Sequence, residues 1–309
     1  MNRKIVSVLL LLLQVSWAQG QGLPEVKLDQ TWKEKIYGLA PEKATFPISE
    51  KKKILVFSLH TGYEHWVIPH TEQMIKIISE KSGAFEVSGS KDISMFEAKN
   101  IAKYDAIVLN NTCSKGDHRN LFWDKLRADS DADSAVLMKK ALQMEENLLQ
   151  YVEKGGGLLL VHGAVTTQNN SRAFSKLVGA SFYYHPPQQA IQIRLADPKH
   201  PLVQAFPATG FNHVDEPYFY KNAYADLDFK PLLYFNNAEI TNQKNPLTEG
   251  KTYVAWIRSQ GKGKVMYCSP SHNAQSFENP DLLRFYLNGL QYVVGDVECD
   301  ETPIGKGSL

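Results

Sequence analysis

The stretch Tyr151–Ala164, YVEKGGGLLLVHGA, joins the end of a helix to a buried strand and decides the fold. The residues before it place an apolar stripe at helical spacing between Ala135 and Lys154, formed by Leu137, Ala141, Met144, Leu148 and Val152. Gly155–Gly157 ends this helix, and Leu158–Val161, which is apolar at every position, predicts a strand covered on both faces. Such a strand belongs to a parallel sheet that carries helices on both sides.

The same alternation of strands and helices extends outward from this stretch. Ile54–Phe57 predicts another buried strand, and Met74–Ile78 belongs to the stripe of the helix after it. Further strands, one tight turn and a closing helix are predicted at Phe85–Val87, Ala106–Leu109, Ile191–Ala196, Tyr253–Ile257, Gly261–Gly263, Val265–Cys268 and Pro280–Gly295. No repeat and no flexible linker divides residues 51–296, so the sequence predicts one α/β domain there.

The segments outside this domain indicate export. Arg3 and Lys4 form a cationic start, Ile5–Val15 is apolar, and Ser16–Ala18 offers a cleavage site, so residues 1–18 predict a signal peptide. The apolar run is shorter than the about 20 residues of a spanning helix, and an uncleaved anchor is the alternative. Residues 19–50 contain three prolines and no period, which predicts an extended leader, and 297–309 form a tail. We expect a periplasmic or extracellular protein that does not span the membrane after cleavage.

Opposite charges nearly cancel, with 34 Lys and Arg against 33 Asp and Glu in 309 residues. Removal of residues 1–18 takes away Arg3 and Lys4, which leaves 34 − 2 = 32 cations against 33 anions. This balance argues against a protein that binds nucleic acid through a basic surface. A hydrophobic fraction of 43% and an aromatic fraction of 11% exclude disorder over most of the chain and are compatible with a homo-oligomer.

The three cysteines indicate neither a disulfide scaffold nor a zinc motif. Cys113, Cys268 and Cys299 are far apart and form no CxxC pair, although an export compartment would permit one disulfide. Cys268 ends an apolar strand, so we expect a small core side chain there and not a nucleophile.

Four polar segments of the sequence are candidates for the functional site. Three of them follow predicted strands, and the fourth lies in a predicted loop. Ligands of open parallel sheets bind at the carboxyl ends of the strands, so these segments are the candidate site. They are His60–Trp66, His162–Gly163, His213–Tyr218 and Ser269–Asn273, and they hold five of the nine histidines. If the strands are neighbours, the side chains meet in one cleft, as a metal site or an acid/base site requires.

Two kinds of chemistry remain open for such a cluster. Imidazoles with the Glu216 carboxylate suit zinc or another divalent metal, but no local motif such as HExxH supports a metal. The same groups would serve without a metal, with Glu216 as the base and a histidine as the acid. The aromatic residues Trp66, Trp123, Tyr183, Tyr184, Tyr218 and Tyr220 could stack on a sugar, or could belong to the core.

Several other functions are disfavoured. Gly155–Gly157 precedes a strand and Gly261–Gly263 lies between two strands, so neither cradles a phosphate at the start of a helix. No GxSxG elbow occurs, and His162 stands where a hydrolase or an amidotransferase would carry Ser or Cys. The alternating aspartates 129, 131 and 133 lack the glycine and the glutamate of a calcium loop.

Four segments together resemble the trehalose-utilisation, ThuA-like family. They are Ile54–His65 (ILVFSLHTGYEH), Tyr151–Ala164, Asp215–Tyr218 and Gly261–Gly289, in the order of the family, and the resemblance covers residues 51–296. It implies a flavodoxin-like, class I glutamine amidotransferase-like three-layer sandwich with a mostly parallel central sheet and no amidotransferase cysteine. It also implies work on trehalose-like disaccharides or glucosides through 3-keto sugars.

The resemblance also implies roles for individual residues. The catalytic candidates, which are also the candidate metal ligands, are His65, His162, Glu216 and His272. Among the candidates for substrate binding, the resemblance implies Tyr218, and the polar segments after the strands add His60, Tyr63, Glu64, Trp66 and Asn273. The chain departs from the family at Gly163–Thr166, where relatives often have Ala-Ala-Thr-Asp, and at Ser271, where they usually have glycine.

The leading hypothesis is an exported enzyme acting on a glucoside, a disaccharide or its 3-keto derivative as a lyase, isomerase or hydrolase. Its partner is a small carbohydrate, and a divalent metal such as zinc is its candidate cofactor. The alternative is a sugar-binding module of an uptake system without catalysis. An amidotransferase that handles ammonia is disfavoured because His162 replaces the required cysteine.

Overall fold

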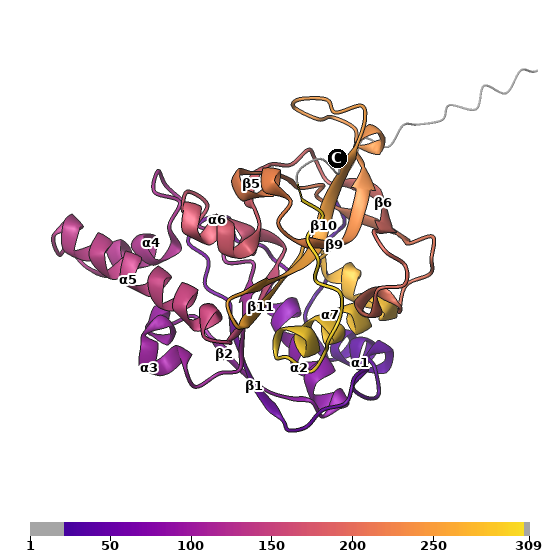
Figure 1. The fold of residues 1–309 in the computed structure, drawn as a ribbon, viewed down its shortest axis with the longest axis horizontal. Coiled ribbons are helices and arrows are strands. Elements are labelled where there is room, and N and C mark those ends of the chain that lie inside the picture. The colour runs from indigo at the N-terminus through magenta and orange to yellow at the C-terminus, as the bar shows by residue number, and fades with distance from the viewer. Residues whose placement is uncertain (1–21, 306–309) are drawn as a thin grey trace, which may run out of the picture.

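A mixed sheet forms the centre of the computed structural model, which describes residues 22–305 (Figure 1). The strand order in this part of the chain is β2-β1-β3-β4-β11-β10-β9-β6-β7. The bounds are β1 Lys52–Phe57, β2 Phe85–Ser90, β3 Ala106–Asn110, β4 Gly157–Val161, β6 Gln189–Leu195, β7 Phe211–Asp215, β9 Lys230–Asn236, β10 Lys251–Gln260 and β11 Gly263–Cys268. A small second sheet pairs β5 Ser181–Tyr184 with β8 Phe219–Lys221. The predicted signal peptide lies outside the described residues.

One half of the sheet is parallel and the other half is antiparallel. From β2 to β11 every neighbouring pair runs parallel, and Val108 pairs with both Val56 and Leu159. From β11 to β7 every pair runs antiparallel, beginning with the β10–β11 hairpin whose turn contains Gly261 at φ 57°. The predicted α/β fold is confirmed, with the antiparallel strands in the half where the sequence alternates between apolar and polar residues.

Helices cover both faces of the sheet, as the buried strands require (Figure 1). On one face lie α1 Gln30–Leu39, α2 Ile68–Ser82 and α7 Pro280–Val293. On the other face lie α3 Ala98–Ile101, α4 Leu121–Asp129, α5 Ser134–Glu153 and α6 Arg172–Val178. Short 3-10 turns occur at Ile93–Phe96, His162–Thr166, Pro201–Val203, Asn222–Asp226, Asn237–Glu239 and Ala274–Glu278. Alternate residues of each parallel strand face each layer, so Leu159 packs toward α7 and Leu160 toward α5.

The glycine run that follows α5 has a packing role as well as a capping role. A methyl group on Gly157 would lie 2.3 Å from the carbonyl oxygen of Val293, so the end of α7 rests directly on the start of β4. The amino end of β4 is therefore packed tightly against α7. This contact fixes the position of the strand whose carboxyl end leads to His162.

The predicted extended leader is wrong for residues 30–39, which form the helix α1. Its N-cap is Asp29, whose side chain accepts a hydrogen bond from the backbone nitrogen of Trp32. The buried side chains of the helix, Trp32 and Ile36, pack against the domain core. The next segment also docks, because the nitrogens of Thr45 and Phe46 both donate to Gln291 Oε1 of α7. Only two side chains of α1 are buried, too few to give a visible helical period in the sequence.

We predict that the docking of α1 weakens in acid. His70 of α2 is 3% exposed and lies between Trp32 and Trp66, at ring-centroid distances of 4.9 and 5.3 Å. Burial lowers the pKa of His70. Its contribution to stability is therefore complete above about pH 6.5, the unfolded value, and is lost as the pH falls through the lowered pKa. His70→Phe keeps an aromatic ring at this position, but the ring cannot be protonated. The variant should therefore lose less free energy of unfolding than the wild type between pH 7 and pH 5.

Urea denaturation at several pH values measures this effect. His118→Phe, at an exposed position, is the matched control and should follow the wild type. Other buried histidines, such as His65 and His200, also have lowered pKa values and contribute to the slope in all three proteins. If the free energy of unfolding of His70→Phe depended on pH in the same way as that of the wild type, the prediction would be refuted.

Two further findings concern the described residues as a whole. Cys113, Cys268 and Cys299 all carry free thiols, and Cys268 is a fully buried core residue. No helix within residues 22–305 has the length and hydrophobicity needed to cross a membrane.

Candidate functional site

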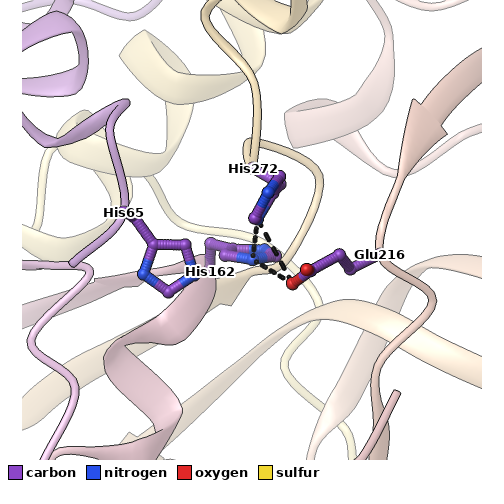
Figure 2. A group of neighbouring side chains, drawn as sticks. All are labelled: His65, His162, Glu216 and His272. Carbon is purple, nitrogen blue, oxygen red and sulfur yellow. Dashed lines mark hydrogen bonds and ion pairs between the residues drawn. The ribbon is translucent and has the colours of Figure 1, made fainter. Parts of the chain in front are cut away.

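The four predicted catalytic side chains come together at the carboxyl ends of the parallel strands (Figure 2). His65 lies in the loop between β1 and α2, His162 directly follows β4, and His272 lies in the loop after β11. Glu216 directly follows β7. One nitrogen or oxygen of each side chain lies within 4.8 Å of those of the others, so the four groups surround one point.

The hydrogen bonds of His162 fix which of its nitrogens faces this point. Its Nδ1 lies 2.8 Å from the carbonyl oxygen of Ser269, which can only accept, so Nδ1 carries a proton. In the neutral ring Nε2 then holds a lone pair, and it lies 3.3 Å from Glu216 Oε2 and 3.1 Å from His272 Nδ1. Lone pairs at these distances repel unless a proton or a metal ion lies between them. A proton on His272 Nδ1 would satisfy one of these contacts, and a cation between the three atoms would satisfy all of them.

His65 completes the group from the side of β1. It is 2% exposed, and its ring meets those of His162 and His272 edge to face at 5.0 and 5.2 Å. Its Nε2 is buried without a hydrogen-bond partner, while Nδ1 lies 3.7 Å from Cys113 Sγ. Burial, together with the neighbouring His162 and His272, holds the pKa of His65 well below its usual value. The ring is thus neutral, which is the form that binds metals.

The charge of the group resides on Glu216. Burial alone would raise the pKa of Glu216, but hydrogen bonds with His162 and His272 outweigh it and lower the pKa. Burial lowers and Glu216 raises the pKa of His272, and the net direction is upward. Glu216 is therefore an anion, and it stabilises a positive charge at the centre of the group.

Asp215, which the sequence analysis did not single out, fixes the backbone of two residues of this group, Glu216 and His272. Its Oδ1 accepts from the Glu216 nitrogen at 2.7 Å, and its Oδ2 accepts from the His272 nitrogen at 3.2 Å. His213 Nε2 donates to the same Oδ2 at 2.7 Å. Burial raises the pKa of Asp215, but the His213 hydrogen bond and nearby charges lower it overall. One buried carboxylate thus connects the loop after β7 with the loop after β11.

Three residues around the site have a strained backbone conformation. Asn111, Arg119 and His162 adopt positive φ values of 52°, 47° and 46°, which cost non-glycine residues about 1–3 kcal/mol each. Asn111 Oδ1 accepts from the Gly163 nitrogen at 3.2 Å and so fixes the turn after His162. A methyl group on Gly163 would come within 2.7 Å of Cys113 Sγ and His65 Cε1. The absence of a side chain at Gly163 therefore leaves the space that His65 and Cys113 occupy.

A cavity of about 270 Å³ opens beside the four groups. Of the predicted site residues, Tyr63, His65, Glu216 and Tyr218 line it. The sequence analysis missed Cys113, Ser114, Arg119, Thr166, Phe182 and His185, which also line it. The volume lies just below the about 300–1,000 Å³ of typical ligand pockets, so the cavity suits a small molecule. A larger hollow of about 470 Å³, which includes Lys52 and Gly156, lies at the amino ends of the strands, away from this cluster.

The aromatic side of the cavity is built from the loops around β5 and β8. His185 stacks on Tyr218 at a centroid distance of 5.3 Å, and its Nε2 lies 3.7 Å from Glu216 Oε2. Burial raises the pKa of Tyr218 and of Tyr63, so both phenols keep their protons and can donate hydrogen bonds. His185 carried no sequence signal, because it stands between strands whose pairing is not local.

Four of the predicted substrate-binding residues do not line the cavity. His60 and Glu64 face each other at 3.5 Å, and Trp66 packs on His70. Asn273 is buried, donates to the Val214 carbonyl oxygen at 3.1 Å and accepts from Gln188. Asn273 therefore fixes the loop after β11.

The thiol beside His65 does not have the properties of a nucleophile. Burial raises the pKa of Cys113 to about 11, so the thiol stays protonated at neutral pH. The sulfur lies 3.4 Å from the Gly163 carbonyl oxygen, to which the thiol donates.

The four groups fit a divalent metal such as zinc. Three imidazole nitrogens and one carboxylate oxygen are a set of ligands that zinc accepts. The unpartnered Nε2 of His65 and the inward-facing Nε2 of His162 are the atoms that such an ion would use. The Nδ1 of His162, bound to a carbonyl oxygen, is the outer partner that metal-binding histidines usually have.

A family model for ThuA, described as trehalose utilisation, matches residues 53–293. The chain belongs to the ThuA family. Two solved structures described as ThuA-like proteins, from Bacteroides uniformis and Parabacteroides merdae, are 19% and 16% identical to this ThuA chain, with TM-scores of 0.59 and 0.56. They cover 81% and 82% of this chain and 94% and 98% of their own. At these identities the likeness concerns the fold, and no curated protein matches the sequence.

Proposed function

We propose that this ThuA protein is an exported enzyme that processes a trehalose-like disaccharide or glucoside, or its 3-keto derivative, by acid/base chemistry. The observation that carries the proposal is the convergence of His65, His162, His272 and Glu216 beside a cavity of about 270 Å³. Polar groups gathered in a concave, partly aromatic cavity are typical of carbohydrate sites. Residues 1–18 carry the features of an export signal and support the location.

The residues of the cavity supply both directions of proton transfer. A ketone at C3 of a sugar makes the neighbouring C2 proton acidic, and removing that proton leads to elimination or isomerisation. In the metal-free site Glu216, a carboxylate on the cavity wall, can take the proton, and His185 at 3.7 Å can relay it or return one. The phenols of Tyr63 and Tyr218 can orient the sugar hydroxyls by donating hydrogen bonds.

We also propose that a divalent metal, held by His65, His162, His272 and Glu216, belongs to this site. When bound, such an ion would polarise an oxygen of the substrate as a Lewis acid. Asp215 and the Ser269 carbonyl oxygen orient the residues that would hold it.

Metal binding tests the cluster without any knowledge of the substrate. We expect protein dialysed against Zn²⁺ to hold one ion per chain in elemental analysis. His65→Ala should weaken binding by more than the about 10- to 100-fold that loss of an outer-shell partner costs, because it removes a ligand. The control His118→Ala, at an exposed histidine, should bind like the wild type. Equal binding by all three proteins would refute the assignment.

The sugar-binding module remains the second candidate, because the cavity would hold a sugar whether or not chemistry follows. It predicts that calorimetry detects unmodified trehalose and that binding survives Glu216→Gln. The enzyme predicts that a 3-keto glucoside is converted to product and that trehalose binds more weakly than the keto compound. Product formation from the keto compound decides between the two.

A further inference from the structure

Arg119 brings a second charged group to the cavity, and nothing in the proposed chemistry uses it. The residue lines the cavity together with His65 and Glu216. Its Nε is buried and has no hydrogen-bond partner. Within residues 22–305 no carboxylate lies within the 4.0 Å of an ion pair from this guanidinium. The five N–H groups of a partly buried arginine normally donate to acceptors. The buried Nε of Arg119 has no such acceptor.

The segment that carries Arg119 is fixed on both sides. Before it, Ser114 Oγ donates to the Thr166 carbonyl oxygen at 2.6 Å. After it, Asn120 caps α4 by accepting from the Trp123 nitrogen at 2.9 Å and bridges to Gln168. Arg119 itself has a φ of 47°, a strained value for a side-chain-bearing residue. The chain thus maintains a costly backbone conformation at the residue whose side chain reaches the cavity.

The surroundings do not neutralise this charge. Cys113, Ser114 and Thr166, which line the cavity with Arg119, are uncharged, and burial raises the pKa of Cys113 to about 11. Glu216 is the carboxylate of the cavity wall, and its Oε2 faces the ring nitrogens of His162 and His272 at 3.3 and 3.2 Å. A metal ion at the cluster would add further positive charge. Arg119 thus presents to the cavity a positive charge that no carboxylate of the described residues holds within ion-pair distance.

We propose that Arg119 forms a subsite for a carboxylate on the substrate, so that the preferred ring is a sugar acid of the hexuronate type. This inference rests on the proposed function, because it places the ring in the same cavity. A planar guanidinium matches a carboxylate through two parallel hydrogen bonds. Arg119, Glu216 and His185 all line this cavity, so a ring bound there can contact all three.

Calorimetry with three small probes tests the subsite without turnover. D-glucuronate carries the carboxylate, D-glucuronamide is its neutral isostere, and D-glucose lacks the group. We expect the wild type to bind glucuronate about 10- to 100-fold more tightly than glucuronamide or glucose, as charge-assisted hydrogen bonds permit. Arg119→Met should abolish this preference, and Arg119→Lys should retain part of it. The exposed Arg172→Met, with the same change of charge, should behave as the wild type.

The experiment is run on protein treated with a chelator and on protein loaded with Zn²⁺. A preference for glucuronate that persists in Arg119→Met would place the carboxylate on the metal or on another group and overturn the subsite. Equal binding of all three probes by the wild type would also overturn it. If glucuronate is preferred through Arg119 but no 3-keto glycoside is ever turned over, the subsite stands and the proposed chemistry fails.

Discussion

Glu216→Gln is expected to lower turnover of a 3-keto glucoside by about 10²- to 10⁴-fold, the range that a general acid or base contributes. The amide keeps the shape of the side chain but cannot take a proton, and it removes the negative charge that His162 and His272 both contact. The lowered pKa of Glu216 keeps the native group ionised at every physiological pH. The substitution therefore removes a charge that is always present in the wild type.

Steady-state kinetics of purified variants measures this effect. Glu80→Gln, an exposed glutamate on α2, makes the same chemical change away from the site and should keep full activity. Circular dichroism should give the same spectrum for all three proteins. Full turnover by Glu216→Gln would remove Glu216 from the mechanism and leave the metal cluster to be judged by its own binding test.

Asp215→Ala is expected to lower the free energy of unfolding by about 3–5 kcal/mol, because three N–H donors lose their acceptor and each unsatisfied buried donor costs about 1–3 kcal/mol. The substitution leaves the buried His213 ring without its 2.7 Å partner and the nitrogens of Glu216 and His272 without an acceptor. Asp215→Asn keeps the shape and one acceptor oxygen, so it should lose less. Both should also weaken Zn²⁺ binding, because two ligand-bearing loops lose their common anchor.

Urea denaturation at pH 7 gives the free energies, with Asp131→Ala at an exposed position as the control. The lowered pKa of Asp215 adds a pH dependence. The stability that it contributes is complete above the unfolded value of about 3.9 and is lost as the pH falls through the lowered native pKa. The difference between the wild type and Asp215→Ala should therefore shrink below about pH 4. An Asp215→Ala protein as stable as the Asp131→Ala control would show that the carboxylate is dispensable.

The errors of the sequence-based prediction have a common physical cause. Helix α1 was predicted as an extended leader because its two buried residues, Trp32 and Ile36, give too little periodicity to mark a helix. Arg119 and His185 carry no motif, since their importance depends on which cavity they reach and not on their neighbours in sequence. His60 and Glu64 were assigned to the substrate because they stand beside His65, yet they face each other.

The sequence by itself determined the parallel half of the sheet and the histidines at its edge. Fully apolar runs such as Leu158–Val161 fold as buried parallel strands, and the ends of such strands meet at one edge, so His65, His162 and His272 had to lie near one another. Only the tertiary structure decided that Glu216 joins them. Strand β7, which it follows, is separated from β11 by β10, β9 and β6 in the sheet order, yet Asp215 accepts a hydrogen bond from the His272 nitrogen. The pairing of antiparallel strands depends on contacts between distant parts of the chain, which local patterns of apolar residues do not encode.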